Sequence, residues 1–291
     1  MASVDVVVVS YNSRQHLREC VAGLAHDDDL HVIVVDNASS DDSLETVADL
    51  RVETSQLAQN RGFSAGCNAG ARLGSAPYVL LLNPDARIDP EGIHVLLRRL
   101  ASDSRVGLVA PKTTDLSGTL LYSRRRFPRL VSTYSRALFL HRLFPHAAAF
   151  DECLRDGTGY ERRGEVEWVS GSCMLIRRSL LDELNGLDEG FFMYYEDTDL
   201  CRRVWDAGFT VEYDPSAVCA HVGGASAPRA ALLPAMARSA ARYASKHAPR
   251  RALMFRLGLA LEAAVRVVVS KPGTARGRGH ARAVSMLLRG A

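Results

Sequence analysis

The chain has 291 residues, of which 47% are hydrophobic and 24% charged. This composition is ordinary for a globular α/β protein, and the length suits one large domain or a domain with a tail. The net charge of +3 is too small to indicate a nucleic-acid partner by itself. The charge is uneven, because the last third is rich in Arg and poor in acids, so the tail needs an explanation of its own.

The N-terminus enters an apolar run at once. Val4–Val9 has no basic segment or small-residue cleavage site ahead of it, which favours a strand over a signal peptide, and we expect a cytoplasmic protein. The six cysteines form no C-x-x-C pair and most have apolar neighbours. Buried, reduced thiols are therefore expected, rather than a zinc site or a disulfide framework.

The first hundred residues alternate apolar, β-branched runs with helical patterns. Continuous apolar strands are typical of sheets covered on both faces, so the pattern predicts an α/β fold with a mostly parallel sheet flanked by helices. The predicted strands are 4–9, 31–35, 51–54 and 78–82, and the predicted helices are 13–24, 42–50, 64–73 and 90–101.

The pattern loosens after residue 109. A long excursion over 112–163, with short helices near 130–143, precedes a second organised block. That block is predicted as a strand at 167–176, a helix at 178–184, a loop at 186–199, a helix through 207 and a strand at 210–213. From residue 230 onward, Ala, Arg and Leu dominate and predict helix.

The longest apolar stretch of the tail, 253–269, is interrupted by Arg256, Glu262 and Arg266. These charges make a bilayer span costly. Two interpretations stay open: an amphipathic helix lying on a membrane surface, or a helix packed on the domain with a solvated basic face.

Polar residues follow the first two strands. Ser10-Tyr11-Asn12 ends the first strand and Asp36-Asn37 the second. Ligands of open α/β sheets bind outside the carboxyl ends of the strands, so these side chains are candidates for holding a base and ribose. The Asp36 carboxylate would accept the imide N–H of uracil or thymine. The alternative is that these residues only form turns and caps.

The stretch from Asn60 to Gly70 combines small residues with Arg61 and a helix start. Small residues let backbone approach a ligand, and a helix N-terminus favours anions, so this stretch suits a diphosphate or ribose. It is neither a Walker loop nor a dinucleotide fingerprint, and its signal alone is weak.

A buried strand ends in Asn83-Pro84-Asp85. Proline stops the strand and leaves the Asp85 carboxylate free, and hard oxygen ligands of this kind suit Mg²⁺ or Mn²⁺ bound to substrate phosphates. The alternative is a solvated turn residue. His221, which precedes two glycines, would complete the metal shell through a neutral imidazole or serve a structural role.

Three acids, Glu196, Asp197 and Asp199, directly follow an aromatic run. Burial and like-charge repulsion raise the pKa of a carboxylate in such a setting, which would suit a general base. The alternative is that the acids only stabilise a helix N-terminus.

Taken in order, seven segments resemble family 2 of the glycosyltransferases, and most closely its bacterial rhamnosyltransferase-like branch, which builds cell-wall and surface polysaccharide linkers. The resemblance covers about Val4 to Gly224. The segments are VVVVSYN, VVDNASSD, NRGFSAGCNAG, LLLNPDA, WVSGSCMLIRR, GFFMYYEDTDLCRR and AHVGG.

The resemblance implies the GT-A fold, in which a Rossmann-like nucleotide-sugar half (1–110) joins an acceptor and catalytic half (111–228), followed here by a basic helical extension (229–291). The family's D-x-D motif appears as Asn83-Pro84-Asp85, so its first acid is missing and a metal role for His221 gains weight. Asp197 falls at the position of the catalytic base, with Glu196 beside it. The residues implied around the nucleoside and sugar are Ser10, Tyr11, Asn12, Asp36, Asn37, Arg61, Gly62, Asn68 and Asn83. Those implied on the acceptor side are Trp168, Gly171 and Ser172.

The implied activity is inverting, Mg²⁺- or Mn²⁺-dependent transfer of a sugar from a nucleotide-diphosphate donor to an acceptor hydroxyl. The resemblance favours dTDP-rhamnose, with galactofuranosyl and hexosyl donors as rivals, and a lipid-linked glycan acceptor at the inner face of the cell membrane, contacted through the tail. Nucleic acid is not expected as a partner. An NAD(P)-dependent oxidoreductase is disfavoured because no glycine fingerprint follows the first strand. A catalytically inactive nucleotide-sugar-binding scaffold remains an alternative because of the altered metal motif.

Overall fold

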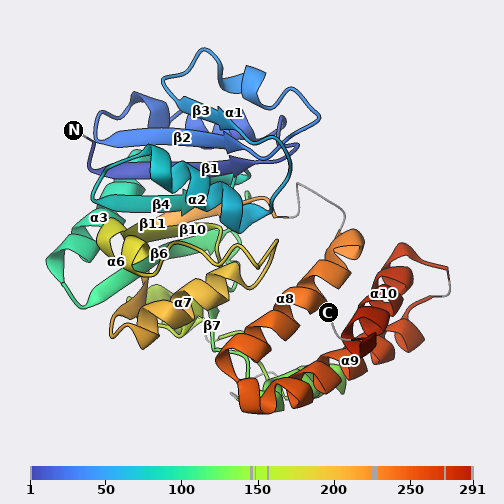
Figure 1. The fold of residues 1–291 in the computed structure, drawn as a ribbon. Coiled ribbons are helices and arrows are strands. Elements are labelled where there is room, and N and C mark those ends of the chain that lie inside the picture. Colours follow the sequence, from blue (N-terminus) through green and yellow to red (C-terminus); the bar gives the residue numbers. More distant parts are fainter. Residues whose placement is uncertain are drawn as a thin grey trace.

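The computed structural model of the chain describes residues 2–144, 147, 149–155, 157–223, 229–271 and 273–289. Within them, one sheet runs in the order β3-β2-β1-β4-β10-β6-β11-β5, with β8 also paired to β11 (Figure 1). Its strands are β1 (Val4–Ser10), β2 (Leu30–Asp36), β3 (Glu53–Gln56), β4 (Tyr78–Leu82), β5 (Ala86–Ile88), β6 (Val106–Thr114), β8 (Gly164–Glu165), β10 (Cys173–Arg177) and β11 (Thr210–His221). A separate two-stranded ribbon joins β7 (Arg124–Arg125) to β9 (Trp168–Val169).

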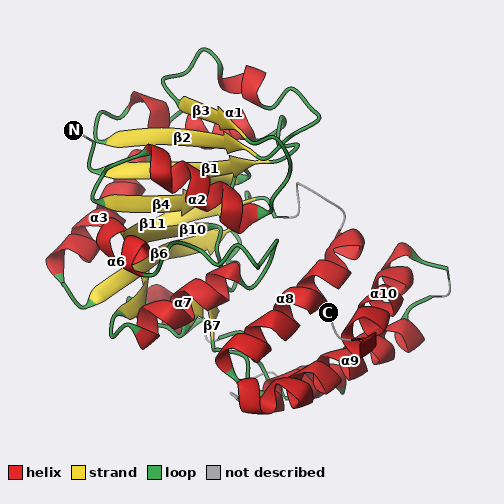
Figure 2. Ribbon diagram, in the orientation of Figure 1, coloured by secondary structure: helices red, strands yellow, loops and turns green. Residues whose placement is uncertain are grey.

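Helices flank the sheet and extend beyond it (Figure 2). Those of the sheet region are α1 (Leu17–Val21), α2 (Phe63–Leu73), α3 (Pro90–Ser102), α6 (Arg178–Glu183) and α7 (Glu196–Asp206). The others are α4 (Leu130–Ala137), α5 (Leu140–Leu143), α8 (Arg229–His247), α9 (Ala252–Val269) and α10 (Ala275–Arg289).

The sheet is parallel through its N-terminal half and mixed beyond it. β1 pairs in parallel with β2 and β4, and β2 with β3. β10 lies antiparallel between β4 and β6. Because Ser10 is opposite Asp36 in the register, the two polar strand ends lie at one edge, as the sequence predicted.

Alternate residues of the central strands face two separate cores. Val4, Val6 and Val8 pack with side chains of α1 and α3, whereas Val7 and Val9 pack with side chains of α2, α6 and α7. Both faces of β1 are therefore covered, which explains why its sequence is apolar at successive positions.

Several predicted elements differ in detail. The helix predicted at 42–50 is only a 3₁₀ turn, Leu44–Val47, because the Asp41 carboxylate accepts bonds from the backbone and hydroxyl of Ser43 just before it. The strand predicted at 167–176 is divided into β9 and β10. The loop predicted through residue 199 ends earlier, because α7 begins at Glu196.

The C-terminal helices form a layer beside the sheet, with α8 nearest to it (Figure 1). Leu259 and Leu287 belong to its own small core, against which Tyr195 of the sheet region packs. Arg242 and Lys246 of α8 both pair with Asp188 at 2.8 Å. In the part of the chain that the structure describes, no helix has the length and apolar character needed to cross a membrane.

The predicted unit boundaries stay proposals. The boundary at 110/111 falls inside β6, so the two proposed halves share one sheet. The boundary at residue 228 and the last residue of the seventh segment, Gly224, lie outside the described residues.

Candidate active site

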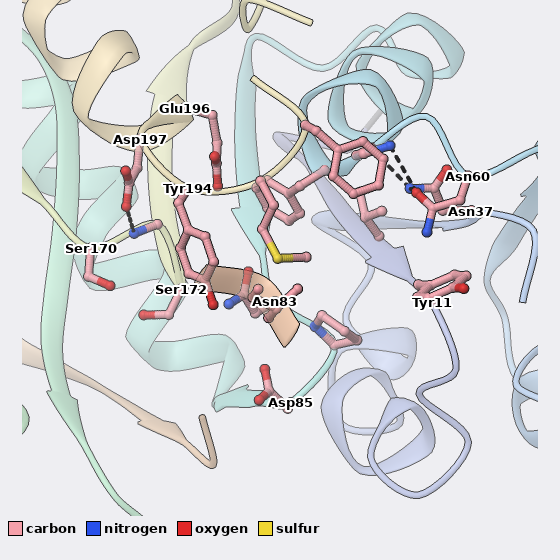
Figure 3. Close-up of a pocket in the computed structure, with 18 of the residues that line it drawn as sticks. Tyr11, Asn37, Asn60, Asn83, Asp85, Ser170, Ser172, Tyr194, Glu196 and Asp197 are labelled. Atoms are coloured by element: carbon pink, nitrogen blue, oxygen red, sulfur yellow. Dashed lines mark hydrogen bonds between the residues drawn. The ribbon is translucent and has the colours of Figure 1, made fainter. Parts of the chain in front are cut away.

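A cavity of about 250 Å³ opens at the carboxyl ends of β1 and β4. Asp85 and Asp197 both line it, and Figure 3 shows them on different sides of the pocket. The predicted site residues that line this cavity are Tyr11, Asn37, Gly62, Asn83, Asp85, Gly171, Ser172, Glu196, Asp197 and His221. Residues far apart in the sequence therefore meet at one site.

Strand pairing brings Asp85 and His221 together. The turn Asn83-Pro84-Asp85 leads from β4 into β5, which pairs with β11 so that Ala86 lies opposite His221. His221 Nε2 then lies 3.1 Å from Asp85 Oδ1, and the N–H of Gly223 donates to Asp85 Oδ2 at 3.1 Å. Burial alone would raise the pKa of Asp85, but the hydrogen bond and charge of His221 and the Gly223 N–H outweigh it, and the pKa lies below its usual value.

This pair fits a divalent cation. Adjacent ligand atoms of an octahedral Mg²⁺ site lie about 3 Å apart, given metal–oxygen distances of about 2.1 Å, and Asp85 Oδ1 and His221 Nε2 are 3.1 Å apart. Asn83, which stands where the D-x-D motif has its first acid, points its amide at His221 Nε2 from 3.3 Å. With one carboxylate and one imidazole, most of the coordination shell would be left to substrate phosphates and water.

Glu196 and Asp197 begin α7 after a strained backbone segment. Tyr194 and Tyr195 both adopt positive φ, 67° and 68°, a conformation unfavourable for aromatic residues. This segment turns the first residues of α7 toward the cavity. Asp197 Oδ2 accepts from the N–H of Gly171 at 2.9 Å (Figure 3), and Asp197 Oδ1 from the N–H of Thr198 at 2.7 Å.

The two adjacent carboxyl groups have unlike surroundings. Burial raises the pKa of Asp197, and the N–H groups of Gly171 and Thr198 partly offset the rise. Burial also raises the pKa of Glu196, and the neighbouring Asp197 charge raises it further. Glu196 Oε2 is buried without a hydrogen-bond partner. Ionisation is therefore more favourable at Asp197, whose carboxylate accepts from two N–H groups, than at Glu196, whose Oε2 has no partner.

Asn37 organises the side of the cavity at which the sequence predicts the nucleotide. Its Nδ2 donates to the carbonyl of Gly62 at 3.0 Å, and its Oδ1 accepts from the N–H of Arg61 at 3.0 Å. Gly62 has φ 87°, and a Cβ there would lie 2.3 Å from the carbonyl oxygen of Phe192. The small residue thus allows the segment before α2 to touch the loop that precedes Glu196 and Asp197.

Six predicted residues do not line the cavity: Ser10, Asn12, Asp36, Arg61, Asn68 and Trp168. The first three lie at the carboxyl ends of β1 and β2, beside Tyr11 and Asn37. Ser10 Oγ is buried without a partner, Asn12 Oδ1 accepts from Ser40 N at 2.8 Å, and Asp36 accepts from the N–H of Ser39 at 3.0 Å.

The other three have structural contacts. Asn68 exchanges hydrogen bonds with the backbone of Leu187, at 2.9 and 2.8 Å, so it braces the loop before α7. Trp168 donates from Nε1 to the carbonyl of Arg126 at 2.8 Å and packs in the core. Arg61 is exposed and pairs with Glu189 at 2.8 Å.

Asp199, the third acid of the run, is also structural. It is fully buried and pairs with Lys246 at 2.8 Å and His247 at 2.7 Å, both on α8. Burial would raise its pKa, but His247, Lys246 and Arg203 lower it below the usual value. Asp199 therefore ties α7 to the C-terminal helices.

Sequence patterns missed part of the cavity wall. The missed residues are Val9, Asn60, Phe63, Pro84, Ser170, Phe192, Met193, Tyr194 and Leu232. The aromatic run before the acids could have indicated 192–194 as lining. Leu232 of α8 carried no signal, yet it brings the C-terminal helices to the cavity, and Ser239 of α8 donates to the carbonyl of Met193 at 2.8 Å.

Asp27, Asp29 and His94 form a second group with metal-ligand geometry. Asp29 directly precedes β2, whereas the cavity lies beyond the last residue of that strand, Asp36. The group is thus at the opposite edge of the sheet from Asp85.

Comparison with known proteins identifies the family of the chain. The model of Glycosyl transferase family 2 matches residues 5–184. The chain is 30% identical over 233 residues, 75% of each chain, to the N-acetylglucosaminyl-diphospho-decaprenol L-rhamnosyltransferase of Mycobacterium tuberculosis. It is 25% identical over 227 residues to rhamnosyltransferase WbbL of Escherichia coli, covering 73% of this chain and 81% of that protein.

Solved structures share the fold at low sequence identity. The mannosyltransferase PcManGT from Pyrobaculum calidifontis, in complex with GDP-Man and Mn²⁺, superposes with a TM-score of 0.58 at 19% identity, covering 94% of this chain and 76% of that one. TarS 1–349 of Staphylococcus aureus gives a TM-score of 0.54 at 15% identity, covering 98% and 90%. The α/β architecture is thus the GT-A fold. The chain belongs to family 2 of the glycosyltransferases, is related to its rhamnosyltransferases, and is itself a glycosyltransferase.

Proposed function

We propose that this chain is an inverting, metal-dependent glycosyltransferase that moves a sugar, with rhamnose favoured, from a nucleotide-diphosphate donor to the hydroxyl of a lipid-linked glycan. The observation that carries this proposal is that the Asp85–His221 pair and the Asp197 carboxylate line one cavity. A cation-binding pair and a base that share a cavity are what displacement at a sugar carbon requires.

Asp85 and His221 would hold the Mg²⁺ or Mn²⁺ that the family uses. When bound, such an ion neutralises the charge that develops on the departing diphosphate. Asp85 suits this role because its depressed pKa keeps it ionised. His221 would bind the cation through a nitrogen of its neutral imidazole.

Asp197 would act as the base. The acceptor oxygen attacks the anomeric carbon from the face opposite the diphosphate, the carbon–phosphate-oxygen bond breaks, and the acceptor proton passes to Asp197. One displacement inverts the carbon and leaves no covalent enzyme intermediate. The hydrogen bonds from Gly171 and Thr198 hold the carboxylate in place, and a positioned base contributes about 10²–10⁴-fold to the rate.

The donor proposal rests on the nucleotide side and on the relatives. Tyr11 and Asn37 line the cavity at the ends of β1 and β2, and buried Asp36 lies beside them. Rhamnose is favoured because two of the similar proteins are named rhamnosyltransferases. The nucleotide favoured with it is thymidine diphosphate, whose imide N–H would reach Asp36.

The C-terminal helices would bring the enzyme to an anionic membrane surface at the cytoplasmic side. Leu253, Leu257, Leu261 and Val268 of α9 are exposed, and their spacing places them on one helix face. Arginines 250, 251 and 256 lie near the start of this helix, and Glu262 is the only acid after residue 228. An apolar face beside a cationic surface fits lipid tails and anionic headgroups.

A thermal-shift panel of nucleotide-sugars, each with and without Mn²⁺, tests the donor proposal. A ligand that binds the native state raises the midpoint of unfolding in proportion to its occupancy. We expect dTDP-rhamnose to give the largest shift and to need the metal. Radiolabelled donor then reports turnover. Metal-dependent binding without transfer or hydrolysis would favour the inactive scaffold, and no shift with any nucleotide-sugar would contradict the proposal.

A further inference from the structure

A second chamber adjoins the catalytic cavity. It has a volume of about 430 Å³ and shares two wall residues, Ser170 and His221, with that cavity. Its other walls come from the end of β6, the ribbon strand β7, the short helix α5 and the segment 151–155. Apart from His221, which the proposed metal site uses, the residues of this chamber have no role in the function proposed above.

The chamber has an excess of positive charge. Of its three arginines, Arg155 pairs with Asp151 at 2.9 Å, and Arg136 pairs with two glutamates that do not line the chamber. Arg125 makes no ion pair with an acid in the described part of the chain. Its guanidinium instead lies over the ring of Trp168, 5.3 Å from the centroid. Asp151 is the only acid among the described lining residues.

The chamber also contains unsatisfied polar groups. Ser123 is 4% exposed and its Oγ has no hydrogen-bond partner. The Nδ1 atom of His141 is buried and likewise has none. Buried polar atoms normally have partners, and a group without one calls for an explanation. A ligand rich in acceptor oxygens would satisfy both Ser123 and Arg125.

We propose that this chamber binds the phosphate groups of the acceptor, namely the diphosphate that joins the acceptor sugar to its lipid. This inference rests on the proposed function and adds the site on this chain that recognises the acceptor. Phosphate oxygens match the geometry of a guanidinium and a hydroxyl. Arg125 supplies the charge and Ser123 a hydrogen bond.

The position of the chamber favours the acceptor over the donor. Ser170 borders the chamber and directly precedes Gly171, whose N–H holds the base Asp197. The acceptor hydroxyl must reach that base. The nucleotide residues Tyr11 and Asn37 line the first cavity and do not line the chamber.

The wall of the chamber that α5 forms leads to a neighbouring groove. His141 of α5 lines the chamber, while the next two residues, Arg142 and Leu143, line a neighbouring groove. That groove also contains Val269, at the end of α9. The order along the surface is therefore catalytic cavity, cationic chamber and this groove, which the apolar side chains of Phe139, Leu143 and Val269 line together with basic ones. The first two match a sugar followed by a diphosphate.

The first test measures the binding of inorganic pyrophosphate by calorimetry in EDTA, where the metal-dependent donor site is disabled. We expect saturable binding by the wild type, weakened roughly tenfold or more in Arg125→Gln and several-fold in Ser123→Ala. The matched control Arg98→Gln removes one positive charge from an exposed residue on α3 and should bind as the wild type does. Ser123→Ala deletes an unpartnered hydroxyl, so its unfolding temperature should not fall.

Three outcomes would contradict the proposal that the chamber binds phosphate groups. They are no saturable pyrophosphate binding by the wild type, unchanged pyrophosphate binding in Arg125→Gln, or pyrophosphate binding that disappears in Asp85→Ala. The last would place pyrophosphate in the donor position. Removing the Asp85 carboxylate should otherwise leave pyrophosphate binding intact, because that residue lines only the first cavity.

The second test compares two acceptors, a short-chain N-acetylglucosaminyl-diphospho-prenol and an octyl N-acetylglucosaminide without phosphate. Arg125→Gln should raise KM roughly tenfold for the first and leave KM unchanged for the second and for the donor. An equal change in the KM of the donor would overturn the assignment to the acceptor. If the wild type uses neither acceptor but pyrophosphate binding still depends on Arg125, the chamber does bind phosphate groups, and the acceptor given under the proposed function is wrong.

Discussion

The two sides of the cavity are built in different ways. The nucleotide side consists of residues at the ends of β1 and β2 and before α2, which the parallel sheet brings together through its own register. The catalytic side depends on contacts across the whole chain: Gly171 holds Asp197, and α8 holds the loop before α7 through Ser239. We therefore expect substitutions in distant segments of the chain to disturb the catalytic side more than the nucleotide side.

The largest effect is expected on the catalytic side, from Asp197→Asn. The amide cannot take the acceptor proton, so the rate should fall about 10²–10⁴-fold while the Kd of the donor stays nearly constant. Radiolabel transfer and calorimetry measure the two quantities. Glu196→Gln is the matched control, because burial and the Asp197 charge favour the protonated form of Glu196, which a neutral amide resembles closely. If both variants lost the same share of the transfer rate, Asp197 could not be distinguished from Glu196 as the base.

Asp85→Ala tests the proposed metal site, which lies between the nucleotide side and the catalytic side of the cavity. It removes the single carboxylate of the proposed metal site and should weaken Mn²⁺-dependent donor binding about 100-fold, with His221→Ala costing about tenfold. Calorimetry with and without Mn²⁺ gives both values. Donor binding that is equally strong with metal in Asp85→Ala would place the ion elsewhere.

Gly62→Ala tests the contact between the two sides. Gly62 and Gly118 both have positive φ, 87° and 84°, but a Cβ would meet the carbonyl of Phe192 at Gly62 and nothing within 4 Å at Gly118. Gly118→Ala should therefore cost only the backbone strain, about 1 kcal/mol, and Gly62→Ala about 2 kcal/mol more. Urea denaturation measures both free energies of unfolding. If both variants lost the same free energy of unfolding, the backbone around Phe192 would move aside without cost to admit the new Cβ.

The same comparison shows what sequence patterns could predict. The strand ends and Asp85 could be indicated because each follows an apolar run, and Asp197 because it follows an aromatic run within a segment that resembles the family. Asn68 and Trp168 are predicted at the substrate by resemblance alone. The structure adds that each donates a hydrogen bond to a backbone carbonyl of the protein, which no pattern of residue types reveals. Leu232 lines the cavity through the packing of a helix more than thirty residues from the acids, so only tertiary structure could place it.

The pH dependence of transfer tests the electrostatics of the catalytic side. Burial raises the pKa of Asp197, and the base works only when ionised. Activity should therefore be full above this raised pKa and fall about tenfold per pH unit below it, starting at a higher pH than for an ordinary Asp, whose pKa is about 3.9. A kcat profile in the presence of saturating donor measures this limb. If kcat began to fall only near the pKa of an ordinary Asp, burial would not raise the pKa of the base.

The smallest expected effect concerns α9. Leu257→Glu places a charge in the exposed apolar face and should weaken sedimentation with anionic liposomes about threefold to tenfold. Leu116→Glu is the matched control, since Leu116 is also exposed, at 54% against 49% for Leu257, but lies in the turn after β6. Point variants are preferable to removing the helix, because α9 packs on α4 through Gly258. Unchanged sedimentation of Leu257→Glu would leave α9 a packed helix with a solvated face.

The most direct measurement is the anomalous scattering of Mn²⁺ in crystals grown with dTDP-rhamnose or its non-hydrolysable analogue. We predict one strong peak within bonding distance of Asp85 and His221, with the anomeric carbon between the ion and the Asp197 carboxylate. A peak only at the group formed by Asp27, Asp29 and His94, at the opposite edge of the sheet, would contradict a shared metal and base cavity.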